Sequence, residues 1–80
     1  MKVLVAEDDP HIRAGLVEIL AAEGYGVIEA GDGVSALARF RADRPDFVLL
    51  DIMMPGQNGY DVLRAIRRDD AAVPVVFVSA

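Results

Sequence analysis

Three carboxylates follow directly after two short apolar segments of the chain. Glu7 and Asp8 come after the apolar residues 3–6, and Asp51 comes after the apolar residues 47–50. Because the carboxyl ends of parallel strands meet at one edge of a sheet, we expect the three acids to converge there, where ligands bind in open α/β sheets. Like charges gathered at one place repel one another unless a cation lies between them. The spacing therefore predicts a divalent-cation site.

The elements that would position these acids alternate between strand and helix. Strands are expected over 2–6, 27–30, 47–50 and 75–78, and the one over 27–30 is half-polar. Asp9, Asp32 and Asn58 are each well placed to cap a following helix, and Pro10 suits the first helical position. The βαβαβαβ order predicts a doubly wound parallel sheet with strand order 2-1-3-4 and right-handed crossovers.

The composition of the chain argues against several classes of protein. Eighty residues make one small domain, 1–80, and 13 Asp/Glu against 8 Lys/Arg give a net charge of −5. An acidic surface repels phosphate backbones, so we expect no direct binding to nucleic acid. No apolar run approaches the roughly 20 residues of a membrane span, and we expect a cytoplasmic protein without membrane contact. The absence of cysteine excludes disulfides and thiolate metal sites.

Four segments together resemble one known family, the response regulator receiver domain of two-component signalling. They are VLVAEDDPHIR, EAGDGVSAL, VLLDIMMPGQNGYDVL and PVVFVSA, and they extend over the whole chain. Any one of them is a weak signal, whereas all four in this order and spacing are specific. The resemblance implies a flavodoxin-like fold, Mg²⁺ as cofactor and a histidine kinase as partner.

The resemblance also assigns roles to individual residues. Asp51 matches the aspartate that accepts a phosphoryl group from the kinase, and Glu7 and Asp8 match the acidic pair that holds Mg²⁺. Asp51 and the backbone carbonyl of Met53 would complete the metal ligands. Ser79 matches the hydroxyl that bonds the phosphoryl oxygen and links phosphorylation to rearrangement. A protein of this kind modifies its own aspartate and is not a turnover enzyme.

Simpler interpretations apply to several of these residues. Asp9 is expected to be a helix cap and not a third metal ligand, and His11 a surface residue and not a phosphodonor. Ser79 could be an ordinary hydroxyl at a strand end. The side chain of Met53 is expected to serve packing in the core or the loop, since only its carbonyl has a role, and Met54 carries none.

The resemblance further implies elements that the 80 residues do not contain. Receiver domains continue with a fifth strand, which carries a lysine that pairs with the phosphoryl group, and with two more helices. Lys2 is the only lysine here, and it stands at the amino end of the first strand. We therefore expect a sheet truncated after the fourth strand, and slower phosphoryl transfer. The exposed apolar edge of the strand 75–78 predicts a homo-oligomer formed through that edge.

Three function classes follow. The first is a phosphoacceptor module, and the alternative is a phosphorylation-incompetent fragment that acts in interaction or self-assembly. The third is a metal-dependent phosphatase or nuclease. A haloacid-dehalogenase-like phosphatase resembles this chain in its nucleophilic aspartate but needs a second acid two residues on, where Met53 stands. The missing acid disfavours the enzyme class.

Overall fold

Four strands and three helices alternate along the chain in the computed structural model, which describes residues 1–78. The elements are β1 (Lys2–Ala6), α1 (Pro10–Ala22), β2 (Gly26–Ala30), α2 (Gly33–Asp43), β3 (Phe47–Asp51), α3 (Gly59–Asp69) and β4 (Val75–Val78). Each strand is five residues or shorter, and each helix is 11 or 13 residues long. The expected alternation of elements is confirmed.

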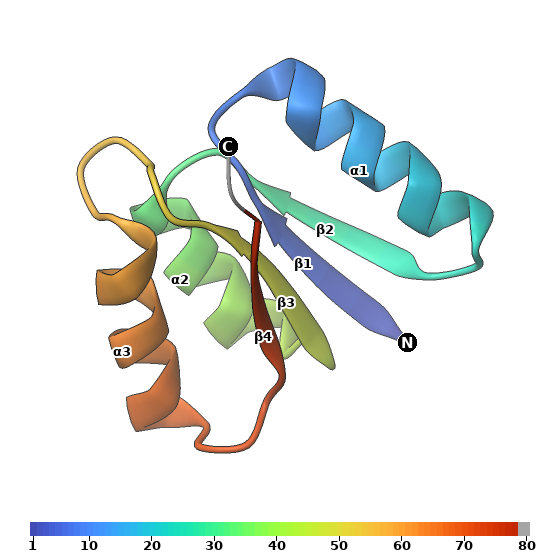
Figure 1. The fold of residues 1–80 in the computed structure, drawn as a ribbon. Helices are drawn as coiled ribbons and strands as arrows, with labels where there is room; N and C mark the ends of the chain where they lie inside the picture. The colour runs from blue at the N-terminus through green and yellow to red at the C-terminus, as the bar shows by residue number, and fades with distance from the viewer. Residues whose placement is uncertain (79–80) are drawn as a thin grey trace.

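The strands form one parallel sheet in the order β2-β1-β3-β4 (Figure 1). Ala6 at the end of β1 pairs with Ala30 of β2 on one side and with Leu50 of β3 on the other. This register brings the carboxyl ends of the three strands to one edge. Both the predicted strand order and the position of the half-polar strand at the sheet edge are confirmed.

The main core lies between the sheet and the two helices α2 and α3, which cover the same face (Figure 1). Leu4, Val48 and Leu50 of the sheet pack there against Phe40 of α2 and Ile66 of α3. All five side chains are at most 1% exposed. Burial of large apolar side chains is the main term that stabilises a domain of this size.

The opposite face of the sheet carries only α1 among the described elements (Figure 1). Val3 and Val5 are fully buried on β1, but α1 itself has no buried residue. Ile12 and Ile19 belong to the apolar stripe that the sequence gives this helix, and they are 42% and 65% exposed. Val76 of β4 is 47% exposed. This face therefore presents apolar side chains to solvent in residues 1–78.

Each helix begins at the residue that the sequence indicates. The Asp9 carboxylate accepts hydrogen bonds from the N–H groups of His11 and Ile12, at 2.8 and 3.2 Å. Asp32 accepts from the Ser35 N–H at 2.7 Å, and Asn58 caps α3 in the same way. These bonds satisfy N–H groups that have no partner inside the helix, and they lower the pKa of Asp9 and of Asp32.

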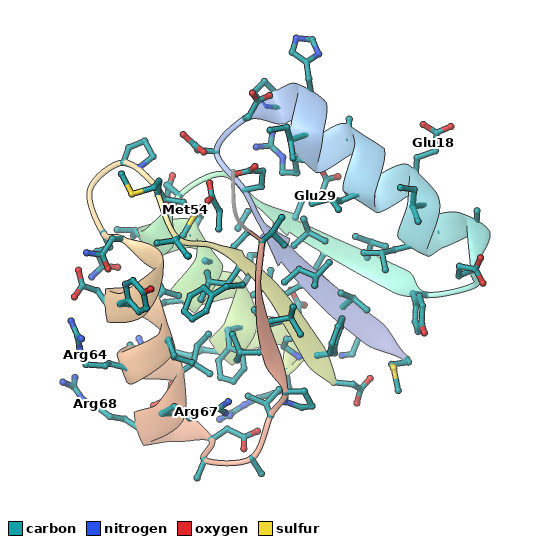
Figure 2. All side chains as sticks on the ribbon, viewed as in Figure 1. Glu18, Glu29, Met54, Arg64, Arg67 and Arg68 are labelled. Carbon is teal, nitrogen blue, oxygen red and sulfur yellow. The ribbon has the colours of Figure 1, made fainter. Side chains whose placement is uncertain are left out.

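Charged side chains of both signs lie on the surface of the fold. Arg64, Arg67 and Arg68 project from α3, whereas Glu18 and Glu29 lie on the side of α1 and β2 (Figure 2). α3 also carries Asp61 and Asp69, which offset most of the charge of its arginines. Within residues 1–78, no helix combines the length and the apolar character that crossing a membrane requires.

Candidate metal centre

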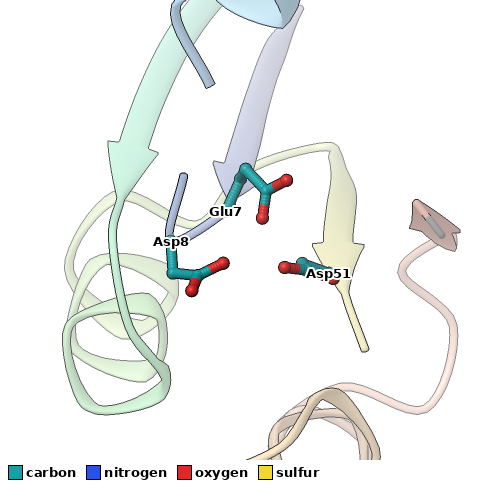
Figure 3. A group of neighbouring side chains, drawn as sticks. All are labelled: Glu7, Asp8 and Asp51. Carbon is teal, nitrogen blue, oxygen red and sulfur yellow. The ribbon is translucent and has the colours of Figure 1, made fainter. Parts of the chain in front are cut away.

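The three acids converge at the carboxyl edge of the sheet (Figure 3). Glu7 and Asp8 lie just after β1, and Asp51 is the last residue of β3, the neighbouring strand. Each residue offers a carboxylate oxygen, and these oxygens all lie within 4.8 Å of one another. Short strands in parallel register thus bring together side chains that are more than 40 positions apart in the sequence.

Two of the three carboxylates are removed from water. Glu7 is 3% exposed and Asp51 is 2% exposed, whereas Asp8 is open to solvent. Burial first, and then the neighbouring carboxylates of Asp51 and Asp8, together raise the pKa of Glu7 from 4.5 to about 7. Without a cation the cluster therefore retains a proton at Glu7 near neutral pH.

One buried oxygen of this cluster lacks any partner. Oε2 of Glu7 accepts no hydrogen bond within the described part of the chain. A buried acceptor without a partner is rare in folded proteins and points to a missing ion or water. Hard carboxylate oxygens at this spacing are the ligands that Mg²⁺ prefers, and Asp8 leaves an open side on which bound water can remain. The residues present therefore fit a hard divalent cation.

The loop after β3 holds Asp51 in place. The backbone N–H of Met53 donates to Oδ1 of Asp51 at 3.1 Å. The Met53 side chain is 71% exposed, so the expectation that it packs in the core or the loop is wrong. Met54, only 8% exposed, fills the core instead. Both methionines lie in the loop after β3, and the path of this loop turns Met53 to solvent and Met54 into the core.

A glycine lets α3 approach the end of β3 closely. The N–H of Gly59, the first residue of α3, donates to the carbonyl of Ile52 at 2.7 Å. A Cβ at this position would overlap the carbonyl oxygen of Asp51 and lie 2.8 Å from the Cα of Ile52. Gly56 in the same loop has a φ of +80°, which favours glycine. The geometry around Asp51 thus depends on two small residues.

The other residues that were considered for the site lie in different surroundings. Asp9 is occupied in the cap of α1, and His11 is exposed, as expected. Lys2 lies at the amino edge of the sheet, where its Nζ donates to the carbonyl of Asp43. Ser79 falls outside the described residues, so its role stays a prediction. The roles of Met53 as a carbonyl ligand and of Asp51 as phosphoacceptor also stay predictions.

Two residues of this region were not predicted from the sequence. Arg13 of α1 donates from Nη1 to the backbone carbonyl of Glu7 at 2.8 Å. Gln57, in the loop before α3, buries its Oε1 without a partner among the described residues. Both residues lie inside segments that carry the family resemblance, but those segments give neither side chain a role, because its surroundings form only when separate elements pack together.

Comparison with known proteins relates this site to a family. Residues 3–80 match the family described as "Response regulator receiver domain". The DNA-binding response regulator MtrA of Mycolicibacterium smegmatis is 46% identical over 79 residues, which cover 99% of this chain and 34% of that protein. The chain thus spans about a third of the length of the curated relatives it matches.

Solved structures show the same relationship. The response regulator protein TrrA of Thermotoga maritima, in complex with Mg²⁺-BeF, superposes with a TM-score of 0.95 at 38% identity, covering 99% of this chain and 69% of that one. The complex of histidine kinase ThkA with TrrA gives a TM-score of 0.91 at 38% identity, covering 99% and 68%. By its family match, its flavodoxin-like sheet and its acidic edge, the chain belongs to the receiver domains of two-component response regulators.

Proposed function

We propose that residues 1–80 form a phosphoacceptor domain in which Asp51 takes a phosphoryl group from a histidine kinase in a Mg²⁺-dependent reaction. The observation that carries this proposal is the cluster of three carboxylates with a buried, unpartnered Glu7 oxygen. Support comes from the solved relative bound to Mg²⁺-BeF and from the complex of that relative with a histidine kinase.

In the proposed reaction, an oxygen of the Asp51 carboxylate attacks the phosphorus of a phosphohistidine. The new P–O bond forms as the P–N bond breaks, and the electron pair leaves with the imidazole of the donor. Asp51 is a weak nucleophile, so the reaction depends on how precisely its carboxylate is positioned. The hydrogen bond from the Met53 N–H fixes one of the two carboxylate oxygens. The product is an acyl phosphate on Asp51. Because the protein modifies itself, no turnover is expected.

Glu7, Asp8, Asp51 and the carbonyl of Met53 are the proposed holders of Mg²⁺. When bound, the ion supplies positive charge that offsets the charges of the carboxylates and of the phosphoryl group. Ser79 is the proposed hydroxyl that bonds the transferred phosphoryl group. The added charge of about −1.5 to −2 on the aspartyl group can then bias a neighbouring loop between two states.

The family and the composition of the chain also indicate the partner and the cellular location of this reaction. We propose a histidine kinase as partner and a cytoplasmic location, and membership of the family supports both. The 80 residues form a single domain, and their net charge of −5 argues against direct contact with nucleic acid. The relative named for DNA binding extends well beyond the matched region, which is 34% of its length.

The test is a mass measurement on the intact chain. We expect incubation with acetyl phosphate and Mg²⁺ to add one phosphoryl group, and expect no addition with chelator or in Asp51→Asn. A folded protein that gains no phosphoryl group under these conditions would support the alternative, a phosphorylation-incompetent module for interaction or self-assembly.

One specific observation favours self-association as a second property of this chain. Among the described residues β4 pairs only with β3, and Val76 on β4 is 47% exposed. An open apolar strand edge is a template for pairing with another chain. We expect light scattering to show oligomers whose population rises with concentration and falls in Val76→Lys. A folded monomer at high concentration would overturn this proposal.

A further inference from the structure

Arg13 connects three elements near the acidic cluster. It lies on α1, its Nη1 donates to the backbone carbonyl of Glu7 at 2.8 Å, and its Nε lies 3.3 Å from Oε1 of Glu29 on β2. The Arg13 side chain is 23% exposed, and the Glu29 side chain is 52% exposed. The ion pair is therefore largely open to water and weak, whereas the bond to the Glu7 carbonyl is part-buried and charge-assisted.

With the hydrogen bond from Arg13, both polar backbone groups of Glu7 have a partner. The N–H of Glu7 donates to the carbonyl of Ala30 on β2 at 3.0 Å, and its carbonyl accepts from Arg13. That carbonyl belongs to the peptide group that joins Glu7 to Asp8. Because a peptide group is planar, fixing its orientation also restricts the directions in which the two side chains leave the backbone.

The sequence leaves space for this guanidinium. A Cβ at Gly31, directly after β2, would lie 3.2 Å from Nη1 of Arg13. The backbone at Gly31 has no left-handed φ, so the constraint is the space beside Arg13. A side chain at this position would press on the arginine that holds the Glu7 carbonyl.

Fixing the Glu7–Asp8 peptide matters because repulsion between the carboxylates opposes the arrangement that a cation needs. To bind a cation Glu7 must lose its proton, and Glu7 and Asp51 are then buried like charges whose repulsion favours moving them apart. Mg²⁺ requires a near-octahedral arrangement with little tolerance in ligand position. The positive charge of Arg13 by itself would weaken the binding of a cation nearby, so any benefit from this residue comes from the position that it imposes.

We propose that Arg13 is a positioning residue for the cation site, acting through the Glu7–Asp8 peptide and not through its charge. This inference rests on the proposed function, since it assumes that the three acids bind a divalent cation. It predicts that loss of the Arg13 hydrogen bond weakens the binding of Mg²⁺ even though a positive charge is removed.

The test is the dissociation constant of Mg²⁺, measured by titration calorimetry on the 80-residue chain and its variants. For Arg13→Ala we expect the dissociation constant to rise about tenfold, which is the usual scale for a partner that orients metal ligands. Arg13→Lys can still donate one bond to the carbonyl, so we expect it to recover part of the affinity. Circular dichroism in chelator establishes that each variant is folded at the temperature of titration.

Two matched controls separate position from other effects. Glu29→Gln removes only the weak ion pair of Arg13 and should leave the dissociation constant within about twofold. Arg41→Ala removes an exposed arginine that pairs with Asp69 at 2.7 Å, and its effect should be equally small. Gly31→Ala should weaken binding in the same direction as Arg13→Ala, because the added methyl group presses on the guanidinium.

The outcomes are distinct for the two proposals. If the unmodified chain binds no Mg²⁺, the proposed function fails, and the inference about Arg13 fails with it. If the unmodified chain binds Mg²⁺ but Arg13→Ala binds it equally well or more tightly, only the positioning role is overturned. Tighter binding would show that the arginine acts by charge alone.

Discussion

Glu7 and Asp51 stand side by side because the residues before them, Ala6 and Leu50, are paired across neighbouring parallel strands. Both carboxylates are at most 3% exposed, and each offers an oxygen within 4.8 Å of the other. Placing two acids together out of water costs stability, which a protein regains only when a proton or a cation is bound between them. The competition between proton and cation underlies the predictions that follow.

The proton held by Glu7 makes stability depend on pH when chelator removes metal ions. The pKa of Glu7 is raised from 4.5 to about 7, so the folded state binds more protons than the unfolded state between these values. The contribution is fully present below pH 4.5 and is lost as pH rises through about 7. We expect the free energy of unfolding to fall by about 2 kcal/mol, less than for a fully shielded group because the site is open at Asp8.

Urea unfolding at several pH values from 5 to 8 measures this effect. Glu7→Gln should have a nearly flat profile over the same window. Asp9 and Asp32 have lowered pKa values and titrate below the window, so they do not mask the change. A profile of the unmodified chain as flat as that of Glu7→Gln would show that Glu7 is ionised throughout this window and would contradict the raised pKa.

Asp51→Asn should change stability in opposite directions with and without Mg²⁺. In chelator the substitution removes a buried charge beside Glu7, so we expect unfolding to cost about 1 kcal/mol more. In excess Mg²⁺ the unmodified chain gains stability by binding the ion, whereas the variant gains little. Thermal unfolding in the two buffers should therefore reverse the order of the two proteins. An unchanged order would contradict a shared cation site.

Gly59→Ala should destabilise the fold, since the added Cβ would overlap the Asp51 carbonyl. We expect a loss of about 3 kcal/mol, the upper end of the range for overpacking, because the obstacle is backbone. Gly15→Ala is the matched control. Gly15 lies inside α1 with nothing within 4 Å of the new methyl group, and the change should stabilise by up to about 1 kcal/mol. Equal effects in chemical denaturation would refute the close approach.

Gln57→Met should raise the free energy of unfolding. Oε1 of Gln57 is buried without a partner among the described residues, and methionine fills a similar volume without that oxygen. We expect a gain of about 1 kcal/mol from removing an unsatisfied acceptor. Gln57→Glu places a charge in the same position and should lower stability. If methionine destabilises, the glutamine makes a bond that its surroundings in residues 1–78 do not reveal.

Local signals in the sequence predicted much of this structure. Asp9, Asp32 and Asn58 cap helices because their side chains act on N–H groups only two or three residues away. The convergence of Glu7 with Asp51 was also predictable, because parallel strands must place their carboxyl ends together. Both inferences need only the local pattern and the sheet topology.

Contacts between separate elements were not predictable in the same way. The helical spacing of Ile12 and Ile19 indicates an apolar stripe, but spacing does not say how much of it a neighbouring element covers, and both side chains are exposed. Arg13 reaches the Glu7 carbonyl only once α1 packs beside β2, and such a bond leaves no pattern in the sequence. Met53 and Met54 are alike in sequence, and the turn of the loop alone decides which is buried.

The most direct test of the central claim is to locate the phosphoryl group on the chain. After reaction with acetyl phosphate and Mg²⁺, borohydride reduces an acyl phosphate and converts the aspartate that carried it to homoserine. Peptide mass spectrometry then identifies the position. We predict homoserine at position 51 and unchanged aspartate at position 8, with no conversion in chelator. Conversion at another residue, or phosphate that resists borohydride, such as a phosphoramidate on His11, would contradict the account.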